Sequence, residues 1–406
     1  MSPFEALRFR DFRLFWFGYL ISRIGSEMQV VAISWHIYLL TGSPLSLGLI
    51  GFARFLPVIF FSLLGGVMAD KFDRKKLLII TQILMIFLSL SLAAATFWGF
   101  VSPLVIYFLI GLNSAIGALE TPTRQSIIPN LVPKKHFMNA VGLSTIMWQT
   151  AVVLGPSISG FIIAYLGVSS IYLINALSFI AVIVASILIK IPINIHSKDV
   201  SFNFSSITHG LSFVFKTPII YSTMLLDFFA TFFSSATVLL PVFATNIFKV
   251  GPSGLGILYA APSLGAIIAG LIVSSLGHIK NQGKILLIAV IIYGFATLSF
   301  GLSKSFSLSL IFLFIGGAGD VISTIIRNTI RQLHTPDYVR GRMVSVNMIF
   351  FMGGPQLGEA EAGVLAALMG TPFSVAIGGI GTIVATIIIA IFTPKLRKYK
   401  GDEIVV

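Results

Sequence analysis

Apolar residues form long stretches along this chain, and short polar segments separate them. Gly and Pro stand at most of the junctions, as in "TGSPLS" at residues 41–46 and "GTPF" at residues 370–373. A helix needs about 20 mainly apolar residues to cross a bilayer. The pattern therefore predicts an all-α polytopic membrane protein with twelve transmembrane helices, at 12–40, 46–69, 75–98, 103–125, 137–166, 169–191, 218–248, 254–278, 284–303, 306–332, 341–368 and 371–393.

Composition agrees with a membrane protein, since 56% of the residues are hydrophobic and 10% are charged. A soluble domain carries about 25% charged residues. The net charge of +13 is spread over short loops, so it does not indicate a nucleic-acid partner. The chain has no Cys, which excludes disulfides and cysteine metal sites. No metal ligand cluster and no cofactor motif is visible, and we expect neither a metal nor a cofactor.

The basic residues alternate from loop to loop. One set of loops, which includes both termini, holds nearly all of the 27 Lys and Arg, and the other set holds Lys249 and Lys304. Basic loops stay on the cytoplasmic side. We therefore expect a multi-pass protein with both termini in the cytoplasm, in contact with the lipid bilayer.

The chain also contains a weak internal repeat. At an offset of 203 residues Thr121, Arg124, Pro133, Gly155 and Gly160 match Thr324, Arg327, Pro336, Gly358 and Gly363, and an offset of 208 relates Pro44, Leu47, Gly48 and Ala53 to Pro252, Leu255, Gly256 and Ala261. Such a repeat divides the chain into two similar halves, and two repeated halves with a binding site between them are typical of transporters. We expect an N-terminal six-helix half at 1–191, a cytoplasmic connector at 192–217 and a C-terminal six-helix half with a short cytoplasmic tail at 218–406.

The segment "GGVMADKFDRKK" at residues 65–76 resembles the signature that the major facilitator superfamily carries between helices 2 and 3. The family usually has Gly where this chain has Asp73. The resemblance implies a cytoplasmic gate in which Asp70 pairs with cations of the facing half. Anchoring by positive charge alone is the alternative, although it does not explain the acidic residues. The residues that carry the match are Gly66, Asp70, Lys71, Arg74 and Lys75.

Further segments narrow the resemblance to the macrolide-efflux and enterobactin-exporter branch. "ETPTRQSIIPNLVP", "MNAVGLS", "RGRMVSV" and "GPQLGEAEAG" carry it. "AVVLGPSISG" resembles the antiporter motif of helix 5 in drug exporters, through Gly155, Pro156 and Gly160; generic helix packing is the alternative. Many drug–proton antiporters carry an Arg inside helix 4, whereas Arg124 here lies at the inner end.

Charged residues inside a membrane span are costly and usually functional. Candidate proton-coupling residues are Glu27, Asp227 and Asp320, since burial raises the pKa of a carboxylate and a nearby Arg lowers it. Arg23 and Glu27, four residues apart, share one helix face and form either a static ion pair or part of the transport site. Arg54 could neutralise Glu27 or Asp227. We take Arg23, Arg54, Glu359 and Glu361 as substrate-cavity candidates, and Glu120, Arg124 and Arg327 as further gate residues.

These features predict a secondary transporter rather than an enzyme. No phosphate-binding loop is visible, so an ion gradient is the expected driving force. The branch that the sequence resembles implies a location in the bacterial inner membrane. It also implies export of a small amphipathic molecule, a drug or a siderophore-like metabolite, by proton antiport with alternating access. We expect a monomer. A lysophospholipid flippase and a non-transporting membrane sensor on the same fold are the alternatives.

Overall fold

The computed structural model describes residues 4–190, 211–276 and 280–401, and every regular element in these parts is helical. For residues 62–67, 69–71, 138, 236, 337–338, 340–342 and 345 it describes the backbone without the side chain. Most of the expected connector at 192–217 lies outside the described residues. Its last part, residues 211–216, is helical.

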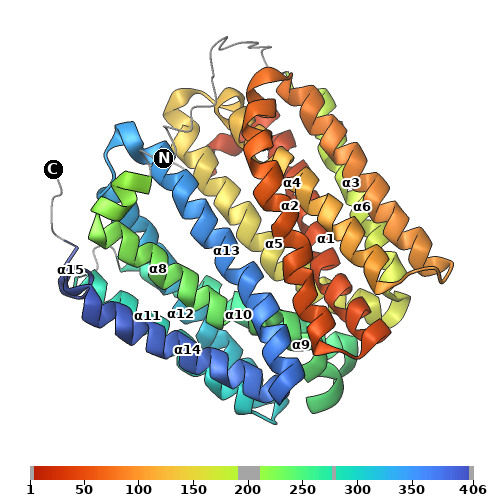
Figure 1. The fold of residues 1–406 in the computed structure, drawn as a ribbon. Coiled ribbons are helices and arrows are strands. Elements are labelled where there is room, and N and C mark those ends of the chain that lie inside the picture. The colour runs from red at the N-terminus through yellow and green to blue at the C-terminus, as the bar shows by residue number, and fades with distance from the viewer. Residues whose placement is uncertain (1–3, 191–210, 277–279, 402–406) are drawn as a thin grey trace. The chain divides into compact units, whose positions relative to one another are not determined.

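The N-terminal half contains six long helices, drawn in red to yellow in Figure 1. Within it, α6 packs against both α1 and α3. The helices are α1 (Arg10–Thr41), α2 (Pro44–Lys71), α3 (Arg74–Phe97), α4 (Pro103–Leu131), α5 (Phe137–Leu166) and α6 (Val168–Leu188), with 3₁₀ turns at Glu5–Arg8 and Lys134–His136.

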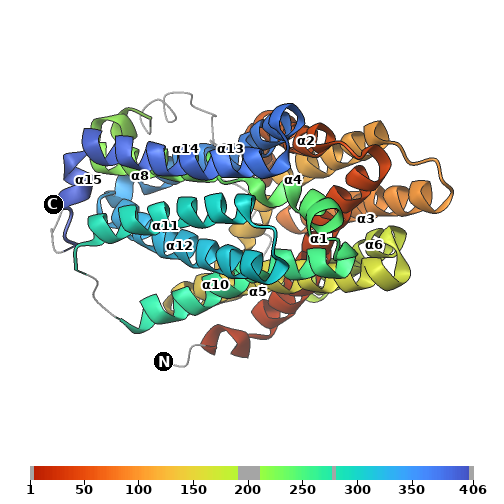
Figure 2. The ribbon, with the colours of Figure 1, turned by 90° about the horizontal axis from the view of Figure 1, so that it is seen from below.

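The C-terminal half has the same sequence of long helices, with a break in the first one. Figure 2 shows α11 between α14 and α12, and α11 packs on both of them. The elements are α8 (Pro218–Phe233), a 3₁₀ turn (Ala236–Leu239), α9 (Leu240–Val242), a π-helical turn (Phe243–Ile247), α10 (Gly251–Ser275), α11 (Gln282–Leu302), α12 (Phe306–Leu333), α13 (Asp337–Met369), α14 (Thr371–Phe392) and α15 (Pro394–Lys398).

The expected span 218–248 is therefore not one continuous helix. Pro241 has no backbone N–H, so it cannot donate to the carbonyl of Thr237 one turn earlier. The hydroxyl of Tyr259 donates to that carbonyl instead, at 3.0 Å. The side chain of Ser235 donates to the carbonyl of Thr231 at 2.7 Å. These contacts satisfy the backbone where the helix is interrupted.

Local sequence signals set several helix boundaries. Asp73 caps α3, because its carboxylate accepts hydrogen bonds from the backbone N–H groups of Lys75 (2.9 Å) and Lys76 (3.1 Å). This explains an acidic residue at the position where the resembling family has Gly. Gly42 ends α1 in the left-handed conformation with φ of 60°, which glycine adopts without steric cost.

Ten of the described helical segments are long and apolar enough to cross a membrane. The other two long helices, α1 with 32 residues and α13 with 33, carry several charged residues each but also have the length to span a bilayer. Together these segments correspond to the twelve predicted spans. Charged residues thus lie within α1 and α13, two of the helices that correspond to predicted spans.

The chain divides into two compact units whose borders cross the two sequence halves. The first unit comprises Met1–Gly42, Ala53–Phe202 and Gly251–Ile257, and the second comprises Ser43–Phe52, Asn203–Val250 and Leu258–Val406. The start of α2 thus packs in the second unit, and the start of α10 packs in the first.

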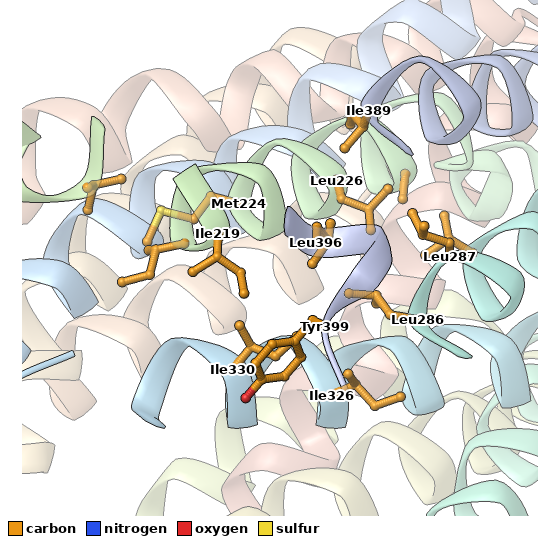
Figure 3. Packing of buried hydrophobic residues seen from close by; sticks show 14 of the residues in the cluster. Ile219, Met224, Leu226, Leu286, Leu287, Ile326, Ile330, Ile389, Leu396 and Tyr399 are labelled. Carbon is orange, nitrogen blue, oxygen red and sulfur yellow. The ribbon is translucent and has the colours of Figure 1, made fainter. Parts of the chain in front are cut away.

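Each unit has its own buried apolar cluster. In the first unit the cluster includes Phe12, Tyr19 and Leu131. In the second unit the short helix α15 closes the cluster, because Leu396 and Tyr399 are buried among side chains of α8, α11 and α12 (Figure 3). The backbone N–H of Gly283 donates to the carbonyl of Tyr399 at 3.0 Å and fixes this segment to α11.

Candidate functional site

In the first unit, Arg23 and Glu27 form an ion pair on α1. Nη2 of Arg23 lies 2.5 Å from Oε1 of Glu27, one helical turn away. The guanidinium also lies over the indole ring of Trp148 on α5, 3.5 Å from its centre. A cation above an aromatic face is stabilised by the ring electrons. Glu27 therefore has its cation on its own helix.

A second charged group in this unit joins α4 to α1. Glu120 is 8% exposed, and its Oε1 accepts a hydrogen bond of 2.5 Å from the hydroxyl of Tyr19. Nε of Arg124 lies 3.5 Å from the same oxygen, and the guanidinium lies 5.5 Å from the Tyr19 ring. Glu120 and Arg124 thus form a buried cluster with Tyr19 of α1. Their expected role in the gate stays a prediction.

The second unit contains a more tightly buried charge cluster around Asp227 of α8. Nη2 of Arg327 lies 3.0 Å from one carboxylate oxygen, and Nη2 of Arg331 lies 2.9 Å from the other. The side chains of all three residues are 3–4% exposed. Arg331 also donates to Oγ1 and the carbonyl of Thr223 and to Oδ1 of Asn347. One carboxylate therefore binds two guanidinium groups inside the unit.

Arg331 is a further member of the cluster that was not predicted from the sequence, although the expected span 306–332 includes it. The signal that could have found it is its spacing. Arg327 and Arg331 are four residues apart on α12, so they lie on one helix face.

Asp320 lies at the edge of this cluster. Its Oδ1 is 3.7 Å from Nη2 of Arg327, and its side chain is 39% exposed, against 4% for Asp227. Arg327 also donates to Oγ1 of Thr324 at 2.8 Å, while its Nε and Nη1 are buried and have no hydrogen-bond acceptor among the described residues. The structure thus brings together Asp227, Asp320 and Arg327, three of the residues singled out from the sequence.

The two clusters occupy related positions in the internal repeat. Arg124 and Arg327 correspond at the offset of 203 residues, and Tyr19 and Asp227 correspond at the offset of 208. In each half the first helix therefore places a hydrogen-bonding side chain beside an Arg of the fourth helix. Tyr19 of α1 lies beside Arg124 of α4, and Asp227 of α8 lies beside Arg327 of α12. In the first unit the acid, Glu120, comes from α4 itself, whereas in the second it comes from α8.

A small polar cavity lies among α1, α2, α4 and α6 in the first unit. Its volume is about 60 Å³, and its lining includes Gln29, Arg54, Asn113 and Asn175. Oε1 of Gln29 accepts hydrogen bonds from Nδ2 of Asn175 at 2.6 Å and from Oγ of Ser89 at 3.1 Å. The uncharged members of this cavity were missed in the sequence, because a single Asn or Gln in an apolar span gives no periodic signal.

Arg54 forms no ion pair with the described residues. Glu27 pairs with Arg23, which lies four residues away on the same helix face, and Asp227 pairs with Arg327 and Arg331.

The motif of helix 5 provides close helix packing within the first unit. A Cβ atom on Gly155 would lie 3.2 Å from the backbone nitrogen of Met28, and one on Gly160 would lie 2.6 Å from Cα of Gly256. The carbonyl of Pro156 also faces Gly256. α5 therefore contacts α1 through one part of the motif and the start of α10 through the other. The proposed antiporter role stays a prediction.

On α13, Glu359 lies at a helix crossing within the second unit. A Cβ atom on Gly51 would lie 3.0 Å from Cβ of Glu359, and one on Gly48 would lie 2.8 Å from Cα of Gly363. Glu361 is half-buried, two residues further along. Their assignment to a substrate cavity stays a prediction.

The segment between α2 and α3 is described in part. The surroundings of Gly66 and the side chains of Asp70 and Lys71 lie outside the described residues, so the expected gate contact of Asp70 stays a prediction. Nζ of Lys75 donates to the carbonyls of Ile187 and Ile189, both at 2.9 Å, and Arg74 donates to the carbonyl of Ser126 at 3.2 Å. Lys75 thus binds the carbonyl end of α6, a position that favours a cation.

Comparison with known proteins agrees with this architecture. The family described as transmembrane secretion effector matches residues 1–405. The enterobactin exporter EntS of Salmonella typhi is 26% identical over 394 residues, which cover 96% of this chain and 94% of the relative. EntS of Escherichia coli O1:K1 / APEC is also 26% identical to this chain, and the match covers 93% of that relative's length.

Solved transporters share the fold. A bacterial homologue of the human lysosomal transporter Spinster, inward-facing and unoccupied, aligns with a TM-score of 0.72 at 14% identity over 95% of both chains. A bacterial homologue of the iron transporter ferroportin, inward-facing, aligns with a TM-score of 0.70 at 14% identity over 96% of this chain and 99% of the other. The all-α polytopic fold and the resemblance predicted from the sequence are confirmed, and the chain belongs to the transmembrane secretion effector family of the major facilitator superfamily, as a multi-pass secondary transporter.

Proposed function

We propose that this transporter exports a small amphipathic molecule, a siderophore-like metabolite or a drug, in exchange for protons and by alternating access. The relatives named as enterobactin exporters support export of a metabolite. The observation that carries proton coupling is the pair of carboxylates, Asp227 and Asp320, that share the guanidinium of Arg327.

The shared guanidinium links protonation to structure. With both carboxylates charged, Asp320 competes with Asp227 for Arg327. When Asp320 binds a proton it loses its charge, and Arg327 then interacts with Asp227 alone. Asp320 is the more accessible of the two carboxylates, since 39% of its side chain is exposed, whereas Asp227 is enclosed by two guanidinium groups. A carboxylate that alternates between water and an Arg changes its proton affinity accordingly.

The first unit supplies the second proton site in this proposal. Glu27 pairs with Arg23, whose guanidinium keeps the support of Trp148 when Glu27 is neutral. Each unit thus has an acid whose protonation releases an Arg. In this proposal both Glu27 and Asp320 must bind and release a proton in each transport cycle, so the substrate moves only in exchange for protons.

Topology and assembly complete the proposal. Both termini lie in the cytoplasm of a bacterial cell, and the protein works as a monomer with six-helix halves at 1–191 and 218–406. The segment that contains Asp70 acts as the cytoplasmic gate, together with Glu120 and Arg124.

The test uses the purified full chain in proteoliposomes with an imposed pH gradient. The probes are enterobactin and the cationic dye Hoechst 33342, and uphill accumulation is measured for the wild type, Asp320→Asn and the control Asp11→Asn. Asp11 lies at the start of α1 with the exposed Arg10 as its partner. We expect accumulation by the wild type and the control, and exchange without accumulation by Asp320→Asn. Full accumulation by Asp320→Asn contradicts the coupling, and no transport of either probe contradicts export.

A lipid substrate is the second candidate, supported by an apolar hollow in the second unit. Its volume is about 320 Å³, and its lining, which includes Ile268, Ile272, Phe314 and Ile322, comes from α10, α11 and α12. An acyl chain suits such a lining. Movement of a fluorescent lysophospholipid between the leaflets of the same proteoliposomes, with no transport of enterobactin or dye, distinguishes this function.

A further inference from the structure

Arg54 is a charged residue inside a membrane span, and among the described residues no acid pairs with it. It lies on α2, which begins at Pro44, about three turns before it. It forms neither an ion pair nor a hydrogen bond with the described residues. A charged group at this depth costs several kcal/mol unless it has a partner or water. The chain therefore keeps this guanidinium at an energetic cost.

Two buried or half-buried acids of the first unit, Glu27 and Glu120, have other partners. Glu27 pairs with Arg23 at 2.5 Å, and its Cβ is directed at Gly155 of α5. Glu120 binds Tyr19 and Arg124. The cavity beside Arg54 is lined by Ser26, Gln29, Val30 and Ile33 of α1, positions that follow one helix face and leave Glu27 out.

The cavity is polar and preformed. Because Oε1 of Gln29 accepts hydrogen bonds from Ser89 and Asn175, its amide NH₂ is the end left as a donor. Oδ1 of Asn113 is buried and has no hydrogen-bond donor among the described residues. Arg54 and Gln29 thus offer donors, and Asn113 offers an acceptor, around the same space.

The size of the cavity limits its occupant to a small group. A single water needs about 10–15 Å³ of such volume, and the cavity measures about 60 Å³. It therefore holds a few waters or one planar group the size of a carboxylate with an adjacent hydroxyl. A guanidinium binds planar anionic oxygen groups well, because its N–H groups form a fork.

We propose that Arg54 and this cavity bind an anionic oxygen group of the transported molecule, a carboxylate or an ionised phenol with a neighbouring hydroxyl or amide N–H. The anionic oxygen accepts from Arg54 and Gln29, and the neighbouring donor binds Oδ1 of Asn113. This site rests on the proposed export function, and it favours an anionic metabolite over a cationic drug.

The experiment compares two probes of nearly equal shape and different charge, salicylate and salicylamide. Equilibrium dialysis measures binding of each radiolabelled probe to the purified full chain in detergent. One hydrogen bond to a charged group corresponds to at least about a tenfold difference in affinity. We expect the wild type to prefer salicylate by about this factor, Arg54→Gln to lose the preference, and Arg54→Lys to retain part of it.

The control variant is Lys304→Gln, which removes the same charge from an exposed position between α11 and α12. It should bind both probes as the wild type does. Asn113→Leu keeps the charge and fills the cavity, so it should weaken both probes. Size-exclusion profiles and helical content establish that each variant is folded.

Two results overturn the proposal: no binding of salicylate by the wild type, or an unchanged preference for salicylate in Arg54→Gln. Failure of the export function gives a different pattern, because the wild type then binds salicylate through Arg54 but transports neither enterobactin nor dye in proteoliposomes.

Discussion

At the scale of single residues, the most constrained charge is the carboxylate of Asp227. It is 3% exposed and has two cationic partners, whereas Nε and Nη1 of Arg327 are buried and have no acceptor among the described residues. Desolvation of such a cluster is costly, and it is offset only while the charges stay paired. Removal of one partner would therefore leave an uncompensated buried charge.

Asp227→Asn should lower the free energy of unfolding by about 3–5 kcal/mol, because it leaves Arg327 and Arg331 buried without their shared anion. Thermal unfolding in detergent measures the change. The control Asp11→Asn removes an acid near the surface and should leave the unfolding midpoint unchanged. Adding Arg331→Gln to Asp227→Asn should recover part of the loss, since it removes one of the uncompensated charges. Equal stability of Asp227→Asn and the wild type would show that the two ion pairs contribute little.

At the scale of the elements, the sequence predicted the helices well and their contacts poorly. Long apolar stretches are a local signal, so each expected span overlaps a helix or, at 218–248, an interrupted one. Side-chain partners are not a local signal. Asp227 and Arg331 are 104 residues apart, and the Gln29–Asn175 hydrogen bond spans 146 residues. The pair Arg23–Glu27 could be foreseen because both residues lie on one helix face.

Close helix packing makes a prediction for α5. Gly160→Ala should lower the free energy of unfolding by about 1–3 kcal/mol, because the new methyl group would overpack the crossing with α10. Its Cβ would lie 2.6 Å from both Cα of Gly256 and the carbonyl oxygen of Pro252. Thermal unfolding in detergent again measures the effect.

The matched control lies on the same helix. Gly142 has no atom within 4 Å of an added Cβ, so Gly142→Ala meets open space. It should be neutral or raise the free energy of unfolding by about 0.5–1 kcal/mol, since Ala loses less backbone entropy than Gly in a helix. If both variants lose the same stability, the helix crossing at Gly160 is not the cause.

At the scale of the whole molecule, the two units carry related but unequal charge clusters. Both place an Arg of the repeat, Arg124 or Arg327, against the first helix of the half. The first unit adds Arg54, which forms no ion pair with the described residues. The second unit adds Asp320, 3.7 Å from the Arg327 guanidinium that Asp227 binds at 3.0 Å. This asymmetry suits an antiporter in which the first unit binds an anionic group of the substrate and the second binds a proton in exchange.

Glu27→Gln tests whether the first unit also takes part in proton coupling. The fold should persist, because Arg23 keeps its contact with Trp148 and its side chain is 32% exposed, so the lost ion pair is not fully buried. Accumulation of enterobactin against a pH gradient should fall to the level of exchange without a gradient, since Gln cannot bind and release the proton. Flux in proteoliposomes measures this, with Asp11→Asn as the matched loss of a carboxylate. If Glu27→Gln accumulates substrate like the wild type while Asp320→Asn does not, the proton binds in the second unit alone, and the pair Arg23–Glu27 is a structural link between α1 and α5.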